Sequence, residues 1–102
     1  MKIVCDIDGV VCTNTWGSYK EAEPLWDNIE ILNLLFNQGH QMVFFTARGY
    51  ETGIDWSIVT ENQFKEWGVK YHDIIMGKPS GDVYIDDKAF NVNEGLNQLL
   101  EK

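Results

Sequence analysis

Short apolar runs alternate along the chain with longer segments in which apolar residues recur at helical spacing. The apolar runs are rich in branched and aromatic residues and end at turn signals, which is typical of buried strands. They predict four strands, at residues 2–7, 41–46, 71–76 and 83–85. Helical spacing predicts a helix between each of the first three strands and a third helix at about residues 93–101.

The first predicted helix begins at Pro24, where the missing N–H of proline is not needed, and stops at Gly39. One face of it carries five apolar residues: Leu25, Ile29, Leu32, Leu35 and Phe36. Residues Trp26 and Trp67 are also expected in the core.

The second predicted helix has Asp55 or Ser57 as its cap and runs to Trp67. Ile58, Phe64 and Trp67 are expected on one side of this helix.

Strands that alternate with helices predict right-handed crossovers and a parallel sheet. We therefore expect an α/β chain with a three-layer α/β/α, Rossmann-like arrangement and strand order 3-2-1-4. The 102 residues suit a single domain over 1–102, without repeats or a linker.

The formal net charge of −8 argues against nucleic-acid partners and against anionic membranes, both of which require basic surfaces.

No signal peptide and no apolar stretch of membrane-spanning length is recognised. Cys5 and Cys12 do not form a CxxC pair and are expected to be reduced thiols. These features predict a cytoplasmic protein.

Polar side chains follow every predicted strand, where the carboxyl ends of parallel strands meet and ligands bind. The residues in these positions are Asp6, Asp8, Thr46, Lys78, Asp86 and Asp87. Carboxylates that converge repel one another unless a cation lies among them, and oxygen ligands without His or Cys suit Mg²⁺. His40 and His72 lie at strand starts, the opposite edge, and receive no role. The pattern predicts phosphoryl transfer, in which a carboxylate attacks phosphorus.

Four segments resemble, in order, the motifs of the haloacid dehalogenase superfamily. The first, Asp6-Ile-Asp8-Gly9-Val10, is similar to the DxDG[TV] motif. The second, third and fourth are Thr46-Ala-Arg, the lysine of Gly-Lys78-Pro, and Val-Tyr-Ile-Asp86-Asp87. An acid two residues after the first aspartate is the phosphatase pattern of that superfamily.

The resemblance implies a role for each matching residue. Asp6 would be the nucleophile and a Mg²⁺ ligand. Asp8 would be the general acid/base, with its backbone carbonyl on the metal. Phosphate would be bound by Thr46, Ala47, Arg48 and Lys78, and Lys78 would also stabilise the nucleophile. The remaining metal ligands would be Asp86 and Asp87.

Several alternatives remain at this point. Asp82 also fits a GDxxxD spelling of the fourth motif, although its strand follows the glycine and does not precede it. Lys70 competes with Lys78, and Arg48 can equally be a surface residue. Receiver domains also accept phosphate on aspartate, but their acidic pair follows the first strand, whereas the pair here comes last.

The resemblance also implies a member without a cap domain, because the intervals between motifs are too short to hold one. Residues 12–23 and the Arg48-to-Trp56 loop are the candidate lids, and a homo-oligomer is a reasonable expectation for so small a domain. We predict a Mg²⁺-dependent phosphomonoesterase for a small substrate such as a sugar phosphate. The alternatives are a nucleotide or polynucleotide phosphatase and a non-catalytic domain that binds Mg²⁺ and phosphate or a partner protein.

Overall fold

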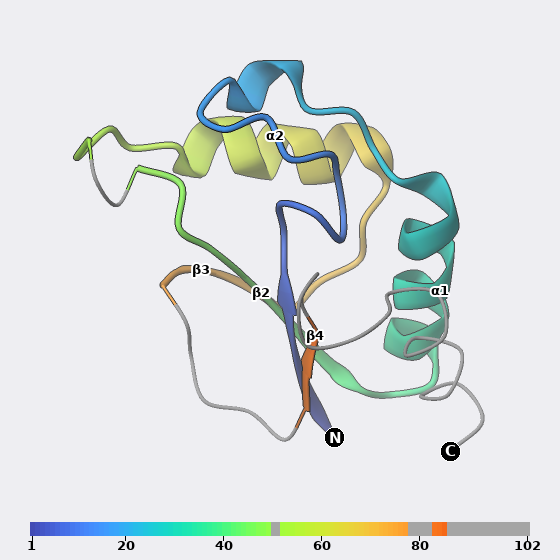
Figure 1. Ribbon diagram of the computed structural model, residues 1–102. Helices are drawn as coiled ribbons and strands as arrows, with labels where there is room; N and C mark the ends of the chain where they lie inside the picture. Colours follow the sequence, from blue (N-terminus) through green and yellow to red (C-terminus); the bar gives the residue numbers. More distant parts are fainter. Residues whose placement is uncertain (50–51, 78–82, 86–102) are drawn as a thin grey trace.

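The computed structural model describes residues 1–49, 52–77 and 83–85 (Figure 1). Strands and helices alternate along most of this part of the chain. The elements in order are β1 (Lys2–Asp6), the short 3₁₀ helix η1 (Tyr19–Glu21), α1 (Trp26–Asn37), β2 (Gln41–Thr46), α2 (Ser57–Trp67), β3 (Asp73–Met76) and β4 (Val83–Ile85).

The four strands form one sheet in the order β3-β2-β1-β4, and all three pairings are parallel. The register aligns the carboxyl ends of three strands: Asp6 pairs with Phe45, and Thr46 pairs with Met76. The polar residues that follow β1 and β2 are therefore delivered to the same edge, as the strand pattern predicts.

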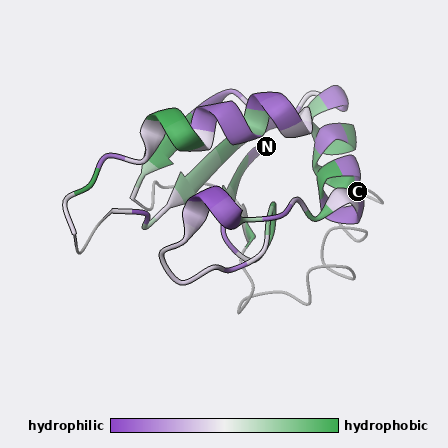
Figure 2. Cartoon of the chain, turned by 90° about the horizontal axis from the view of Figure 1, so that it is seen from above, coloured by the Kyte–Doolittle hydropathy of each residue, from purple (hydrophilic) through white to green (hydrophobic). Residues whose placement is uncertain are grey.

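Both helices pack against the same face of the sheet. One core cluster joins α1 and α2 to alternate residues of β1 and β2, which point to one face because strand side chains alternate. Its principal members are Ile3, Cys5, Ile29, Leu32, Leu35, Met42, Phe44, Phe64 and Trp67. Figure 2 shows the strands coloured as hydrophobic, whereas the helices carry both colours. The α/β class is confirmed; the predicted helix at 93–101, and with it the third layer, lies outside the described residues.

The first helix begins two residues later than predicted, at Trp26. The residues before it are held in an extended form by the turn after β1: Cys12 forms an antiparallel bridge with Pro24, and Leu25 N–H donates to the carbonyl of Val11 at 2.9 Å. These backbone bonds fix where the chain enters α1. Strand β3 is also shorter than predicted, starting at Asp73.

Two apolar residues are exposed against expectation: Trp26, which is expected in the core, and Ile58, which is expected on the side of α2 that carries Phe64 and Trp67. Trp26 has 60% of its surface accessible because it shares a helical face with Glu30 and Asn33, turned away from the sheet. Ile58 is 70% accessible and lies one turn before Glu61 and two turns before Lys65 on the outer face of α2. The buried face of that helix carries Phe64 and Trp67, as predicted, together with the polar Thr60 and Gln63.

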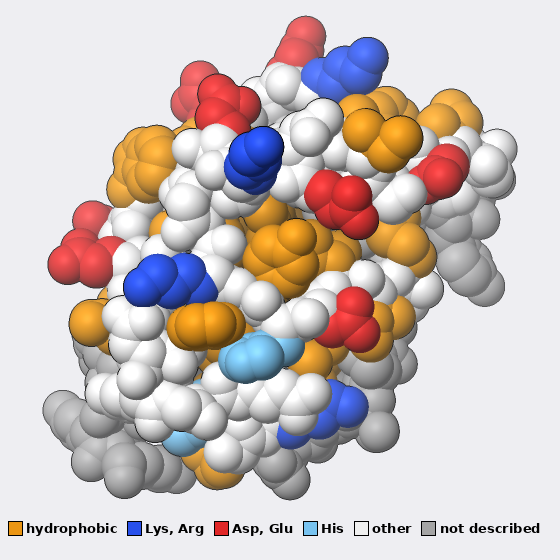
Figure 3. Space-filling model, turned by 180° about the vertical axis from the view of Figure 1, so that it is seen from behind, with side chains coloured by type: hydrophobic (Ala, Val, Ile, Leu, Met, Phe, Trp, Pro, Cys, Tyr) orange, Lys and Arg blue, Asp and Glu red, His pale blue; other side chains and the backbone are white. Residues whose placement is uncertain are grey.

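The surface of the described residues mixes acidic and basic side chains. Figure 3 shows them interspersed on the face opposite to Figure 1, with no basic side chains gathered there. Within the described ranges, no helix is long and apolar enough to span a membrane.

Replacing Phe64 by alanine should lower the free energy of unfolding by about 3–5 kcal/mol, because the ring is fully buried and packs edge-on against Phe44 at 5.0 Å. The matched change Ile58→Ala, on the exposed face of the same helix, should alter stability by less than about 0.5 kcal/mol. Urea denaturation followed by circular dichroism measures both. Equal losses for the two variants would contradict this assignment of the helix faces.

Candidate active site

The segment after β1 is a tight turn that places two aspartates at the edge of the sheet. The carbonyl of Ile7 accepts the N–H groups of Val10 and Val11, at 3.3 and 2.9 Å. Gly9 makes this turn possible because its φ of 93° lies in the left-handed region that side chains disfavour. Asp6 therefore ends the strand, half-buried, and Asp8 follows inside the turn.

The carboxylate of Asp8 is bound by groups from the end of β2. The Thr46 hydroxyl donates to Oδ2 of Asp8 at 3.1 Å, and the Arg48 guanidinium donates to both carboxylate oxygens, its shortest bond being Nη2 to Oδ1 at 2.8 Å. The backbone N–H of Arg48 in turn donates to the Thr46 hydroxyl at 3.1 Å. These bonds link the first two sequence motifs directly.

The side chain of Arg48 is fully buried, although sequence alone left it open as a surface residue. Its Nη1 donates to Thr60 at 3.0 Å and to Gln63 at 2.7 Å, both on the inner face of α2. The guanidinium carbon also lies 4.8 Å from the centre of the Tyr19 ring. A buried guanidinium needs such partners, since a charge removed from water is costly unless it is paired and hydrogen-bonded.

Cys12 lies in the same cluster. Its Sγ is 3.7 Å from Oδ1 of Asp8 and 3.5 Å from Nη2 of Arg48. Burial and, to a smaller extent, the negative charge of Asp8 raise the pKa of the Cys12 thiol to about 12. Cys5 and Cys12 are both free thiols, as predicted, and both are buried.

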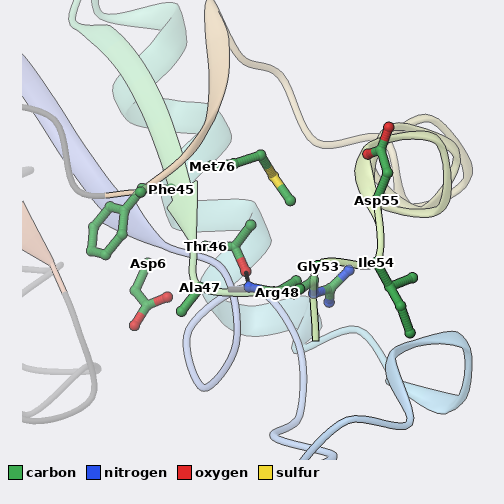
Figure 4. Close-up of a pocket in the computed structure, with 11 residues that line it drawn as sticks. Asp6, Phe45, Thr46, Ala47, Arg48, Gly53, Ile54, Asp55 and Met76 are labelled. Atoms are coloured by element: carbon green, nitrogen blue, oxygen red, sulfur yellow. Dashed lines mark hydrogen bonds between the residues drawn. The ribbon is translucent and has the colours of Figure 1, made fainter. Parts of the chain in front are cut away.

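A cavity of about 370 Å³ opens beside Asp6 and runs past the ends of β2 and β3 (Figure 4). Thr46, Ala47, Arg48 and Gly49 line it on one side, and Ile54 and Asp55 line its far part. Figure 4 shows Asp6 and Asp55 at opposite ends of the labelled residues.

Gly49 fixes the path of the chain around this cavity. Its φ is 81°, and a Cβ added there would lie 2.0 Å from the carbonyl oxygen of Ile54. The Gly53 N–H donates to the Gly49 carbonyl at 2.8 Å. Asp55 then accepts the N–H of Ser57 at 2.9 Å at the start of α2, and the side-chain and backbone bonds from Ser57 lower the pKa of Asp55.

The structure brings together four of the predicted site residues: Asp6, Thr46, Ala47 and Arg48 all line the cavity. The carboxylate of Asp8 is directed into the buried cluster, toward Thr46 and Arg48. Lys78, Asp86 and Asp87, and the alternative Asp82, lie outside the described residues. Within the described part of the chain, no group of three or more His, Cys, Asp or Glu residues could hold a metal.

The two candidate lids contact each other near the site. Tyr19, in the segment 12–23, packs edge-on against Trp56 with ring centres 5.0 Å apart, and its carbonyl accepts a bond from Gln63. Trp16, in the same segment, is 91% accessible.

Sequence reasoning missed three of the residues that surround Arg48, namely Cys12, Thr60 and Gln63, whereas the fourth, Tyr19, belongs to a candidate lid. The signal was present in α2, where Thr60 and Gln63 occupy the same helical face as Phe64 and Trp67. Polar residues within an apolar stripe require buried partners, which points to a polar network beneath this helix.

In a Cys5→Ala variant, Cys12 should react with iodoacetamide at pH 8 at least about 100-fold more slowly in the folded chain than in urea, because its raised pKa and its burial suppress the thiolate. The raised pKa should also make stability decline as the pH rises above 9.0, where the unfolded chain loses the proton first. Mass spectrometry of the alkylated protein measures the rate. Fast labelling of the folded protein would show that the thiol is accessible and ionised.

The comparison with known proteins finds solved structures that resemble this chain. No family model and no curated protein sequence matches the chain. An MCSG target protein from Vibrio cholerae aligns with a TM-score of 0.73 and 28% identity, over 99% of this chain and 98% of that one.

Two further structures match over the whole of this chain but over less than two thirds of their own length. A chain of the Pnkp1/Rnl/Hen1 RNA repair complex aligns with a TM-score of 0.61 and 15% identity, covering 99% of this chain and 31% of that one. The D,D-heptose 1,7-bisphosphate phosphatase from B. bronchiseptica, complexed with magnesium and phosphate, aligns with a TM-score of 0.55 and 18% identity, covering 100% and 65%. At these identities the likeness shows the fold alone, an α/β fold that this chain shares with both structures.

Proposed function

We propose that the chain is a Mg²⁺-dependent phosphohydrolase of the haloacid dehalogenase type that uses Asp6 as its nucleophile. The observation that carries the proposal is the pairing of two aspartates at one sheet edge: Asp6 lines an open cavity, while Asp8, two residues later, is anchored by Thr46 and Arg48. Two acids in different environments suit two different chemical tasks.

In the proposed reaction, a carboxylate oxygen of Asp6 attacks the phosphorus atom of a phosphomonoester. The bond from phosphorus to the leaving oxygen breaks, and Asp8, which must enter this step protonated and turned from Arg48 toward the cavity, supplies the proton that the leaving alcohol needs. Water then attacks the aspartyl-phosphate and gives its proton to Asp8. Asp6 and inorganic phosphate are released, so both aspartates return to their starting state.

The groups around the phosphoryl site follow from the motif match. Thr46, Ala47 and Lys78 are proposed to bind phosphate oxygens; Thr46 and Ala47 line the cavity next to Asp6. The Thr46 hydroxyl donates to Asp8 in the structure and can turn to a phosphate oxygen when that group is bound. We assign the Arg48 side chain to holding Asp8, because its guanidinium is buried against that carboxylate.

The proposed donor set consists of oxygen atoms, which suit Mg²⁺. Asp6 offers a carboxylate at the sheet edge, and the backbone carbonyl of Asp8 is a second hard oxygen donor. Asp86 and Asp87 are proposed to complete the ligand set. When bound, the ion would neutralise negative charge on the phosphoryl group. The phosphatase from B. bronchiseptica, which has a similar fold, holds magnesium and phosphate.

A small phosphomonoester such as a sugar phosphate remains the proposed substrate class. The likeness to a chain of an RNA repair complex favours a polynucleotide or nucleotide phosphatase as the second candidate, whereas the net charge of −8 counts against a polymer. A non-catalytic domain that binds Mg²⁺ and phosphate is the third. The homo-oligomer and the cytoplasmic location stay predictions.

Hydrolysis of p-nitrophenyl phosphate should require both the metal and the nucleophile. We expect turnover with Mg²⁺, none above background with EDTA, and none with Asp6→Asn, because the amide is not a nucleophile for phosphorus. Turnover that survives in Asp6→Asn would contradict the proposed mechanism.

Asp8→Asn should lower kcat by about 10²–10⁴-fold, the usual range for losing a general acid/base. Calorimetry should show that the same variant still binds Mg²⁺, because the proposed metal contact of Asp8 is its backbone carbonyl. Wild-type hydrolysis in this variant would favour a role for Asp8 that is only structural.

Arg48→Lys should lower kcat while leaving KM within about twofold of the wild-type value. One ammonium group cannot replace a guanidinium that binds Asp8, Thr60 and Gln63 together. Gln63→Leu serves as the matched control: it removes one bond to Arg48 without touching Asp8, so its loss of kcat should be smaller. A large rise in KM with unchanged kcat would instead mean that Arg48 binds the substrate.

A further inference from the structure

The cavity beside Asp6 has walls that are mostly apolar. Besides Asp6, Thr46, Arg48 and Asp55, the residues that line it are Phe45, Ala47, Gly49, Gly53, Ile54, Met76 and Gly77. Its volume of about 370 Å³ lies within the range of small-molecule sites, which combine apolar walls with a few polar groups. Because the proposed nucleophile lines this cavity, we expect the cavity to bind the part of the substrate that leaves with the alcohol oxygen.

Two of the apolar walls are exposed side chains. Ile54 is 54% accessible and Met76 is 43% accessible, and Figure 4 shows them from separate elements, Met76 at the end of β3 and Ile54 before α2. An apolar ligand group seated between them would remove this surface from water, which is favourable in proportion to the area covered.

The polar side chains in the middle of the cavity are directed elsewhere. The hydroxyl of Thr46 and the guanidinium of Arg48 bind Asp8, and Arg48 also binds α2. A sugar ring carries a hydroxyl on most of its carbons, and each hydroxyl that loses water without gaining a partner lowers affinity. Among the described lining residues, Asp55 is the acidic side chain at the far end of the cavity, where its Oδ1 also accepts the bonds from Ser57.

We propose that this cavity selects phosphomonoesters whose leaving group carries an aromatic ring, seated against the apolar wall that includes Ile54 and Met76, with any hydrogen-bond donor of the ring directed to Asp55. The proposal rests on the phosphohydrolase function above; it keeps the class of small phosphomonoesters but replaces the sugar phosphate as the preferred substrate. It favours aryl-bearing alcohols or nucleosides over bare sugars as the leaving group.

Benzyl phosphate and glucose 6-phosphate test the preference, because both release a primary alcohol and so differ little in leaving-group reactivity. We expect kcat/KM to be at least about tenfold higher for benzyl phosphate, because apolar contacts in a pocket usually discriminate between substrates by at least that factor. Adenosine 5′-monophosphate as a third substrate separates a nucleoside from a simple aryl group: a higher kcat/KM for the nucleotide than for benzyl phosphate would favour a nucleoside as the leaving group.

Ile54→Asn should reduce the ratio of the two kcat/KM values by about tenfold. Ile58→Asn is the matched control, since the same substitution falls four residues later on an exposed position outside the cavity, and it should keep the wild-type ratio. A preference for glucose 6-phosphate, or an unchanged ratio in Ile54→Asn, would overturn the proposal.

Binding of non-hydrolysable phosphonates separates this proposal from the proposed function. With Mg²⁺ present, calorimetry should give a Kd for phenylphosphonate about tenfold below that for methylphosphonate, with the difference lost in Ile54→Asn and kept in Ile58→Asn. If the difference in Kd is observed but the protein hydrolyses no phosphomonoester, the phosphohydrolase proposal is wrong and the aromatic site stands. Equal affinities for the two phosphonates would remove the aromatic site even in an active enzyme.

Discussion

The ion pair between Asp8 and Arg48 is the interaction on which the rest of the site depends. It joins the turn after β1 to the loop after β2, and through Thr60 and Gln63 it joins both to α2. Removing one partner of such a buried pair costs roughly 3–5 kcal/mol, because the other charge stays buried and unpaired. The pair therefore constrains the relative position of three elements at the carboxyl edge of the sheet, the edge where Asp6 meets the cavity.

This arrangement gives the two aspartates of the first motif different surroundings, although they are two residues apart. Asp6 faces an open cavity with apolar walls, whereas Asp8 is held by a hydroxyl and a guanidinium inside the fold. In the proposed mechanism the acid/base is Asp8, whose carboxylate is held by Thr46 and Arg48 at the end of β2. The proposed nucleophile must be reachable by the substrate, and the cavity beside Asp6 provides that access.

Strand and helix positions could be predicted because apolar runs and helical spacing report burial directly; β2 and β4 have the predicted bounds. The edge that gathers polar residues also followed from parallel strands. The burial of the Arg48 side chain could not be predicted, because a loop residue shows no periodicity. Its burial depends on Thr60 and Gln63, which lie twelve and fifteen positions later. The apolar character of Trp26 predicts a place in the core, and that of Ile58 predicts a place beside Phe64 and Trp67, but both residues lie on helical faces that point to solvent.

The central claim, a covalent phosphoryl group on Asp6, is tested most directly by trapping that intermediate. Borohydride added during turnover with Mg²⁺ reduces an aspartyl-phosphate to homoserine, which peptide mass spectrometry locates. The account predicts homoserine at position 6, more of it in Asp8→Asn if the second step is slowed more than the first, and none in Asp6→Asn. Homoserine at another aspartate, or none at all while hydrolysis proceeds, would contradict it.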